Sequence, residues 1–398
     1  MNHPQLNWIE SQRETMLSRV LDWADINSHS FNTDGLAVML ASLERDFSSL
    51  NGEVEKIPLY PIETISPQGL NSTIALGEVL HITKRPEAPL QLLFGGHMDT
   101  VYPADSEFQN TQMLDTNTLR GPGVTDMKGG LAVMLTALEA LEQSPHADQI
   151  GYRIIINPDE EIGSPGSTHV FQEHANGCAA AFLFEPAFSD QSLASSRKGS
   201  SNYTILVRGK SAHAGRDFFT GKSAIATLSE LLVNIHRLNH PEKETTLNLG
   251  YIYGGGPVNI VPDQAMCRLN VRAVTKEEME ITERQLNEMM AELAKKHDVN
   301  CRLIKEIQRP PKPFDKETEK LYGDLRTCAQ ELGYDLQWHP SGGACDGNTL
   351  AAMGIPTIDC CGVIGGNIHT HSEFVLIDSL VDKAKWVAHY LIKRAEGK

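Results

Sequence analysis

Histidine and acidic residues recur where predicted strands end, and these side chains are the usual protein ligands of catalytic zinc. They lie in five segments of the chain: FGGHMDT, RGPGVTDMKGG, NPDEEIGSPGS, FLFEP and GGNIHTHSEF. Each segment alone has an ordinary explanation, such as a helix cap or a solvated acidic turn. Together they supply several carboxylates with imidazoles, a donor set that suits Zn²⁺, with Co²⁺ or Mn²⁺ as substitutes.

Two of these segments carry neighbouring groups whose expected roles differ. His97 and Asp99 are two residues apart, so in an extended backbone they leave the same face, and Asp99 is placed to hold the imidazole from behind. Glu160 and Glu161 are adjacent and point to different sides, which allows one to bind a metal while the other acts as a general base. Five ligands exceed what one catalytic zinc uses, whereas two ions that share a carboxylate would use them all.

These groups require a domain in which strands alternate with helices. The apolar segments LQLLFGG, YRIIINP and AAAFLFEP read as strands, and MKGGLAVMLTALEALEQ reads as a helix among them. The alternation predicts an α/β fold with a mostly parallel sheet that binds ligands at its carboxyl ends. Between residues 196 and 310 the order becomes β-α-β-β-α-β, typical of a ferredoxin-like α+β domain. We therefore predict a discontinuous catalytic domain, 1–195 and 311–398, with an inserted domain, 196–310.

The composition limits the partners and the compartment. The 398 residues include 35 Lys and Arg against 51 Asp and Glu, a net charge of −16 that disfavours nucleic acid and anionic membranes. The chain has no apolar run near the roughly 20 residues of a membrane span, and its first residues lack a signal-peptide pattern. Seven scattered cysteines favour reduced thiols, so a cytoplasmic protein is expected.

Seven motifs, in this order and spacing, resemble the zinc aminoacylase/carboxypeptidase family: FGGHMDTV, GPGVTDMKGG, NPDEEIGSPGS, FEPA, GKSAHAG, SGGACDGN and HTHSEF. That family includes glutamate carboxypeptidase, acetylornithine deacetylase and succinyl-diaminopimelate desuccinylase, and the glutamate carboxypeptidase branch is the most similar. The resemblance implies a zinc-exopeptidase-like α/β/α catalytic domain with an inserted dimerisation domain. It also implies a dizinc metallopeptidase that cleaves an amide or peptide bond next to a free carboxylate. An N-acyl amino acid deacetylase or dipeptidase is the alternative, and a catalytically silent metal-binding protein is a remote one.

The resemblance further implies two Zn²⁺ ions per subunit, with Asp126 bridging them. His97 and Glu185 would complete the ligands of one ion, and Glu161 and His371 those of the other. Of the two C-terminal histidines, His369 and His371, the resemblance favours His371, which directly precedes Ser372. The implied catalytic residues are the general base Glu160, the supporting carboxylate Asp99, and His213, which would reach into the active site of a partner subunit.

Substrate recognition is implied for Arg272, Asn259, Arg309 and Gly343. Arg272 matches the residue that binds the substrate carboxylate, with Arg309 as a second candidate, because a guanidinium pairs with a carboxylate through two hydrogen bonds. Asn259 would be supplied across the dimer. The run from Gly342 to Asp346 reads G-G-A-C-D where the family usually has G-G-G-T-D. A homodimer follows from these roles, and we expect its interface on the helix 223–238 and on an edge strand near 203–207.

Two competing interpretations are weaker. The segment GRDFFTGKSA has five residues between its glycines where a phosphate-binding loop has four, and no GxGxxG fingerprint occurs. Cys345 has no base in a suitable context, so we interpret it as a small buried thiol and not as a nucleophile.

Overall fold

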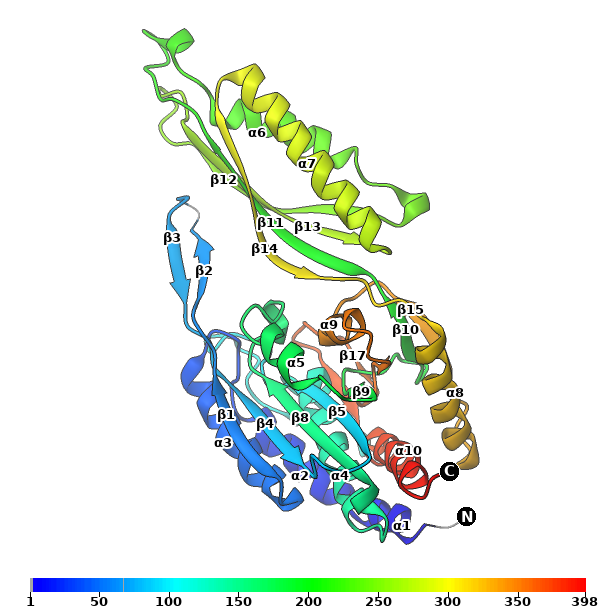
Figure 1. The fold of residues 1–398 in the computed structure, drawn as a ribbon. Helices are drawn as coiled ribbons and strands as arrows, with labels where there is room; N and C mark the ends of the chain where they lie inside the picture. Colours follow the sequence, from blue (N-terminus) through cyan, green and yellow to red (C-terminus); the bar gives the residue numbers. More distant parts are fainter. Residues whose placement is uncertain (1–2, 67) are drawn as a thin grey trace.

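Two sheets organise the chain, and each has its own apolar core (Figure 1). The computed structural model describes residues 3–66 and 68–398. The smaller lobe runs from Gly199 to Arg309, and the larger lobe contains the rest of the described chain. The predicted division at 195/196 and 310/311 lies close to these points and stays a prediction.

The larger lobe is built on a six-stranded sheet in which four neighbouring strands are parallel. The two strands at one edge, β1 and β4, are antiparallel to their neighbours. In spatial order the strands are β1 (Glu53–Pro58), β4 (Glu78–Lys84), β8 (Ile150–Asn157), β5 (Leu90–His97), β9 (Ala180–Leu183) and β16 (Thr357–Ile358). The central strands are apolar almost throughout because helices cover both faces of a parallel sheet.

Helices cover both faces of this sheet, because consecutive buried side chains of β5 point to opposite faces. Leu92 and Phe94 pack into the core on one face, and Leu93 packs into the core on the other. The first face is covered by α1 (Pro4–Ser11), α2 (Arg13–Ala24), α3 (Thr33–Phe47), α4 (Gly129–Glu142) and α10 (Asp378–Ala395), with α8 (Lys316–Glu331) against α10; the second is covered by α5 (Thr168–His174) and α9 (Asp346–Ala352). The α/β/α prediction is confirmed.

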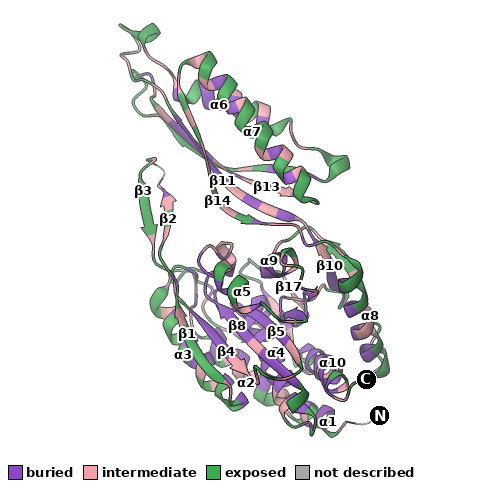
Figure 2. Cartoon of the chain, viewed as in Figure 1, coloured by how far each residue is buried: buried purple, intermediate pink, exposed green. Residues whose placement is uncertain are grey.

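The smaller lobe is a four-stranded antiparallel sheet with two helices on one face (Figures 1 and 2). Its elements follow the order β11 (Gly199–Arg208), α6 (Ala224–His236), β12 (Thr246–Gly254), β13 (Gln264–Ala273), α7 (Lys276–His297) and β14 (Asn300–Arg309). The sheet order β12-β13-β11-β14 is the ferredoxin-like arrangement that the sequence predicted. The prediction of an edge strand near 203–207 is wrong, because β11 pairs with β13 on one side and β14 on the other. The edges are β12 and β14.

Short strands connect segments that are far apart in the sequence. A four-stranded sheet joins the C-terminal part to the region before α4, and it consists of β17 (Gly365–Gly366), β18 (Phe374–Leu376), β7 (Thr118–Arg120) and β6 (Gln112–Met113). Two further pairs are β10 (Leu193–Arg197) with β15 (Trp338–Ser341), and β2 (Ile62–Ile65) with β3 (Asn71–Ile74). The β2–β3 hairpin leaves the larger lobe and contacts the smaller one. The backbone carbonyl of Ile65 in the hairpin accepts a hydrogen bond from the guanidinium of Arg268.

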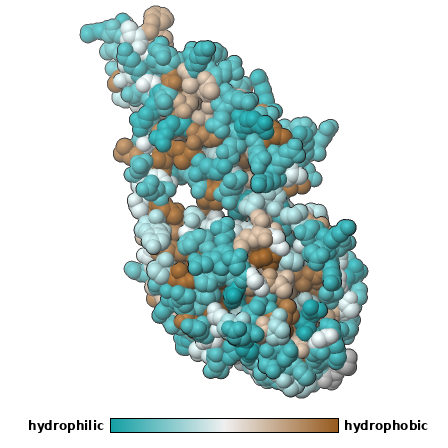
Figure 3. All heavy atoms as spheres, in the orientation of Figure 1, coloured by the Kyte–Doolittle hydropathy of each residue, from teal (hydrophilic) through white to brown (hydrophobic). Residues whose placement is uncertain are grey.

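Hydrophilic side chains cover most of the visible surface, and apolar ones are exposed among them over the strands of the smaller lobe (Figure 3). Among the described residues, the helices are either too short or too polar to cross a bilayer.

Candidate active site

The predicted ligands of the larger lobe meet at the carboxyl ends of its parallel strands. His97 is the last residue of β5, Glu160 and Glu161 form a turn three residues after β8, and Glu185 follows β9 by two residues. Because β8, β5 and β9 are adjacent and parallel, these ends lie at one edge of the sheet. The sheet topology therefore gathers side chains that are almost ninety positions apart in the sequence.

A first group of ligand atoms surrounds the imidazole of His97. Its Nε2 lies 3.1 Å from Oδ1 of Asp126 and 4.0 Å from Oε2 of Glu185. Asp126 is presented by a buried turn before α4 that follows Gly123, whose φ of 70° favours glycine. All three side chains are buried.

A second group uses the other oxygen of Asp126. Its Oδ2 lies 3.3 Å from Nε2 of His369, and the same nitrogen lies 3.2 Å from Oε2 of Glu161. Asp126 thus stands between two imidazoles with one carboxylate oxygen toward each, as a bridging ligand would.

The structure places His369, and not His371, beside Asp126, which corrects the sequence-based choice. His371 instead lies 3.3 Å from the hydroxyl of Ser106, and its ring stacks on Phe108 with 5.6 Å between the centroids. The turn that contains both histidines has left-handed backbone at Asn367 (φ 55°) and His369 (φ 62°). This turn aims His369 at the carboxylates and leaves His371 on the outer side.

Asp99 lies behind the first group and connects it to the second. One carboxylate oxygen lies 3.3 Å from Nδ1 of His97 and accepts the backbone N–H of Glu160 at 3.1 Å. The other accepts the N–H of Glu161 at 3.1 Å and the hydroxyl of Ser30 at 2.7 Å. The buried carboxylate therefore fixes both the imidazole and the turn that carries the two glutamates.

Glu160 faces a guanidinium. Its Oε1 lies 2.7 Å from Arg309, which also pairs with Asp346 at 3.1 Å and donates to the hydroxyl of Ser164. Burial raises the pKa of the Glu160 carboxyl, although Arg309 opposes the shift. Arg309 is itself buried and already paired with two carboxylates.

Sequence reasoning missed Glu373, which holds the Asp126 turn in place. Its buried carboxylate accepts the backbone N–H groups of Gly123 at 3.1 Å, Thr125 at 2.8 Å and Asp126 at 3.0 Å. The hydroxyl of Tyr102 donates to the same carboxylate at 2.7 Å. The motif HTHSEF contains this glutamate next to the two candidate histidines.

The cluster is rich in negative charge for a buried site. Burial, followed by repulsion from Asp126, raises the pKa of Glu161 to about 8, and burial also raises that of Glu185. Hydrogen bonds to Asp126 and Glu161 raise the pKa of His369 to about 10. His97, Asp126 and Glu161 each offer an atom within 4.8 Å of the others, which is the spacing of a metal-ligand group. Bound cations would neutralise the carboxylates, so the donor set fits metal ions.

A cavity of about 430 Å³ opens onto this cluster. Five of its lining residues are the predicted general base and members of the two groups described above: Asp126, Glu160, Glu161, Glu185 and His369. Arg272 and Gly343 also line it, and Arg272 donates to the carbonyl of Gly342 at 2.7 Å. His213 and Asn259 are exposed in the smaller lobe, where Ala214 donates to the carbonyl of Asn259 at 2.9 Å. The structure therefore does not bring these last two into the cavity of their own chain.

Comparisons with known proteins identify the family of this chain. Residues 93–393 match Peptidase family M20/M25/M40. Carboxypeptidase G2 from Pseudomonas sp. (strain RS-16) is 27% identical over 310 residues, which cover 77% of this chain and 74% of that protein.

Solved structures share the fold. A tripeptidase from Staphylococcus aureus superposes with a TM-score of 0.76 at 22% identity, covering 96% of this chain and 99% of its own. A dinuclear metal-binding peptidase of the M20 family from Bacillus subtilis gives a TM-score of 0.68 at 15% identity, with 98% and 99% covered. Since the family match spans most of the chain, the protein belongs to peptidase family M20/M25/M40 and is a hydrolase that acts on peptide or other C–N bonds.

Proposed function

We propose that the protein is a dizinc hydrolase that cleaves an amide or peptide bond next to a free carboxylate. The observation that carries the proposal is the position of Asp126 between His97 and His369, with one oxygen toward each. One ion would be held by His97, Asp126 and Glu185, and the other by His369, Asp126 and Glu161. The name of the Bacillus subtilis peptidase, which describes a dinuclear metal site, supports two ions here.

The fit of the residues to zinc rests on their chemistry. Two imidazoles and three carboxylates form a nitrogen and oxygen set that zinc prefers, with Co²⁺ or Mn²⁺ as substitutes. When bound, the two ions would lower the pKa of a water molecule and polarise the scissile carbonyl.

The residues of the chain perform the proton transfers and hold the geometry. Glu160 would take a proton from the attacking water and return it to the leaving amine, and burial raises the pKa of its carboxyl, which favours uptake of the proton. Arg309 orients the Glu160 carboxylate through their 2.7 Å contact. Asp99 holds the His97 ring and the Glu160–Glu161 turn in fixed positions relative to each other. A preorganised base of this kind is a recurrent source of hydrolytic rate enhancement.

Recognition of the substrate carboxylate is assigned to Arg272 in preference to Arg309. Arg272 lines the cavity, whereas Arg309 is already paired with Glu160 and Asp346. Gly343 lines the same cavity and leaves room for a substrate chain. The names carboxypeptidase and tripeptidase among the similar proteins favour a peptide with a free carboxylate.

A homodimer would complete the site. His213 and Asn259 lie together on the smaller lobe, and neither lines the cavity of its own chain. The edge strand β12 has an unpaired side and carries the exposed apolar residues Tyr251, Ile252 and Tyr253. Edge strands with apolar side chains pair readily with a symmetry copy. Through β12 and α6, a partner would present its His213 to stabilise the oxyanion.

The division of roles between Glu160 and Glu161 provides the first test. We expect Glu160→Gln to retain both zinc ions and lose most turnover, because only the proton acceptor is removed. Glu161→Gln should lose one zinc ion together with activity. Zinc content by mass spectrometry and hydrolysis of a panel of carboxypeptidase, dipeptide and N-acyl amino acid substrates provide the measurements. Equal zinc loss in both variants would refute the assignment.

The shared site is tested by mixing two inactive variants, Glu160→Ala and His213→Ala. In a mixed dimer, one active site combines an intact base with an intact histidine of the partner, so part of the activity should return. Mass spectrometry of differently labelled subunits confirms that exchange has occurred. If subunits exchange and the mixture stays inactive, His213 does not act in trans.

A further inference from the structure

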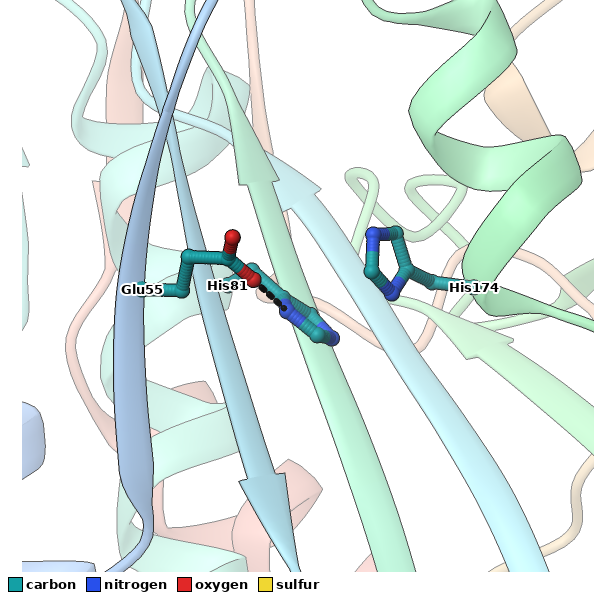
Figure 4. A group of neighbouring side chains, drawn as sticks. All are labelled: Glu55, His81 and His174. Carbon is teal, nitrogen blue, oxygen red and sulfur yellow. Dashed lines mark hydrogen bonds and ion pairs between the residues drawn. The ribbon is translucent and has the colours of Figure 1, made fainter.

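A second histidine–carboxylate cluster lies away from the cavity. It is near the β1 edge of the larger sheet, on the face that α5 covers. Glu55 on β1 and His81 on β4 are direct partners across the antiparallel pair, and His174 ends α5 above them. Figure 4 shows the His174 ring turned toward the other two side chains. The cluster therefore joins three elements: an edge strand, its neighbour and a covering helix.

The spacing of the three donors fits a metal ion. Nδ1 of His81 lies 3.3 Å from Oε2 of Glu55, and all three residues offer ligand atoms within 4.8 Å of one another. Zinc bonds of about 2.0–2.2 Å place neighbouring tetrahedral ligand atoms about 3.3–3.5 Å apart. The Glu55–His81 pair already has this separation. His174 is half-buried at the end of its helix, and its ring centroid lies 3.9 Å from that of His81 at an interplanar angle of 45°. The His174 ring therefore has to turn before its nitrogen reaches the same distance.

The surroundings orient the buried imidazole. The hydroxyl of Thr83 lies 3.4 Å from Nε2 of His81, on the side away from Glu55, so it can fix the ring as outer partners of metal-bound histidines do. Arg153 is the nearby cation, and its guanidinium donates to the carbonyls of His174 and Asn176 at 2.8 and 2.6 Å. It thereby anchors the end of α5 that carries the third donor.

We propose that Glu55, His81 and His174 form a separate transition-metal site that takes Zn²⁺ with a water as fourth ligand. Two imidazoles and one carboxylate are a known zinc set, and Ni²⁺ or Co²⁺ would compete for it. The ion would tie the edge strand β1 to β4 and to α5. It uses no residue of the cavity.

The test counts zinc in the full-length protein. Wild type and the variants Glu55→Gln and His174→Asn are stripped with chelator and equilibrated with buffered free Zn²⁺, and bound zinc is measured by mass spectrometry. Matched controls are Glu53→Gln, two residues earlier on the same face of β1, and His169→Asn, an exposed histidine on α5. Glu55 and His174 are not part of the buried core, so both variants should fold, which circular dichroism verifies.

We expect Glu55→Gln and His174→Asn each to bind one zinc equivalent fewer per chain than wild type, with hydrolysis unchanged within twofold. The rise in melting temperature on adding Zn²⁺ should also become smaller in these two variants. Zinc content equal to wild type in both would overturn the proposal. An equal loss in Glu53→Gln or His169→Asn would overturn it as well, because the bound zinc would then be adventitious surface zinc.

Discussion

The two lobes differ in what they bury. The larger lobe encloses many charged side chains, among them Asp99, Lys128, Lys312, Asp359 and Lys383. Between Gly199 and Arg309 the one buried charged side chain is Arg309, at the boundary, and the core is apolar. Burying a charge costs stability unless it is paired. The larger lobe therefore bears this cost at many buried positions, whereas the smaller lobe largely avoids it by keeping its core apolar.

The largest effect expected from this comparison concerns the two C-terminal histidines. Replacing His369 with Ala removes the proposed metal ligand that contacts Asp126 and Glu161, and kcat/KM should fall on the order of 10³-fold. Replacing His371 with Ala removes only a ring stacked on Phe108, and kcat/KM should stay within about fivefold. Steady-state kinetics on one substrate compares them, and similar losses in both would contradict the placement.

In the smaller lobe, stability should depend on apolar packing. Leu286 on α7 is fully buried, and Leu286→Ala should lower the free energy of unfolding by about 2–5 kcal/mol. Because no ionisable group is involved, the loss should be the same at pH 7 and pH 10. Urea denaturation at both pH values measures this loss of unfolding free energy. A loss that differs by more than 1 kcal/mol between the two pH values would contradict the expected difference between the lobes.

In the larger lobe, stability should depend on pH through Lys383. Burial lowers the pKa of its ammonium from 10.5 to about 8, although it donates to the carbonyl of Gln191. Between these pKa values the unfolded chain binds more protons than the folded one, so the free energy of unfolding rises with pH across that window. Below the window, the full free-energy cost of burying the charged ammonium is present.

Lys383→Met removes this dependence. Relative to wild type, the variant should gain about 3 kcal/mol less from a change of pH 7 to pH 10.5, on the basis of roughly 1.4 kcal/mol per pKa unit. The variant also loses the hydrogen bond to Gln191, but this changes its unfolding free energy by the same amount at both pH values. The difference between the two pH values is therefore unaffected by that loss. Parallel pH profiles for the two proteins would show that Lys383 keeps an ordinary pKa.

The smallest effect is expected at the β12 edge. Ile252 is 60% exposed, so Ile252→Ser should change the unfolding free energy of a single subunit by less than about 0.5 kcal/mol. The same change should weaken self-association, measured by sedimentation velocity. A stability loss above 1 kcal/mol in dilute protein, with association unaltered, would remove β12 from the proposed interface.

The sequence predicted the α/β/α fold and the ferredoxin-like insertion. Most of the ligands that it proposed lie together in the structure, because their positions depend on strand ends. His97, Glu160 and Glu185 follow apolar strands directly, and parallel strands bring their ends together. Asp126 was found through the glycines that force its turn. These are properties of local sequence and of a known topology.

What could not be predicted depends on backbone turns and on sheet order. The direction of His369 is set by left-handed residues in its turn, which strand alternation does not describe. Glu373 acts through backbone N–H groups that are contributed by a segment almost 250 positions earlier. The inner position of β11 follows from the return of β14 to its free side, and a strand pattern alone does not reveal this order.

The pairing of Ser200 with Arg309 has a consequence for how such a chain could have been assembled. Antiparallel partners of this kind have α-carbons about 5 Å apart. The two points at which the smaller lobe joins the larger lobe are therefore as close together as the two ends of a tight loop. The entropy of closing a loop grows only logarithmically with its length. Recombination could therefore lengthen, shorten or exchange everything between these two positions as one module. Because Arg309 contacts Glu160, such an exchange would have to preserve its final residue for the active site to survive.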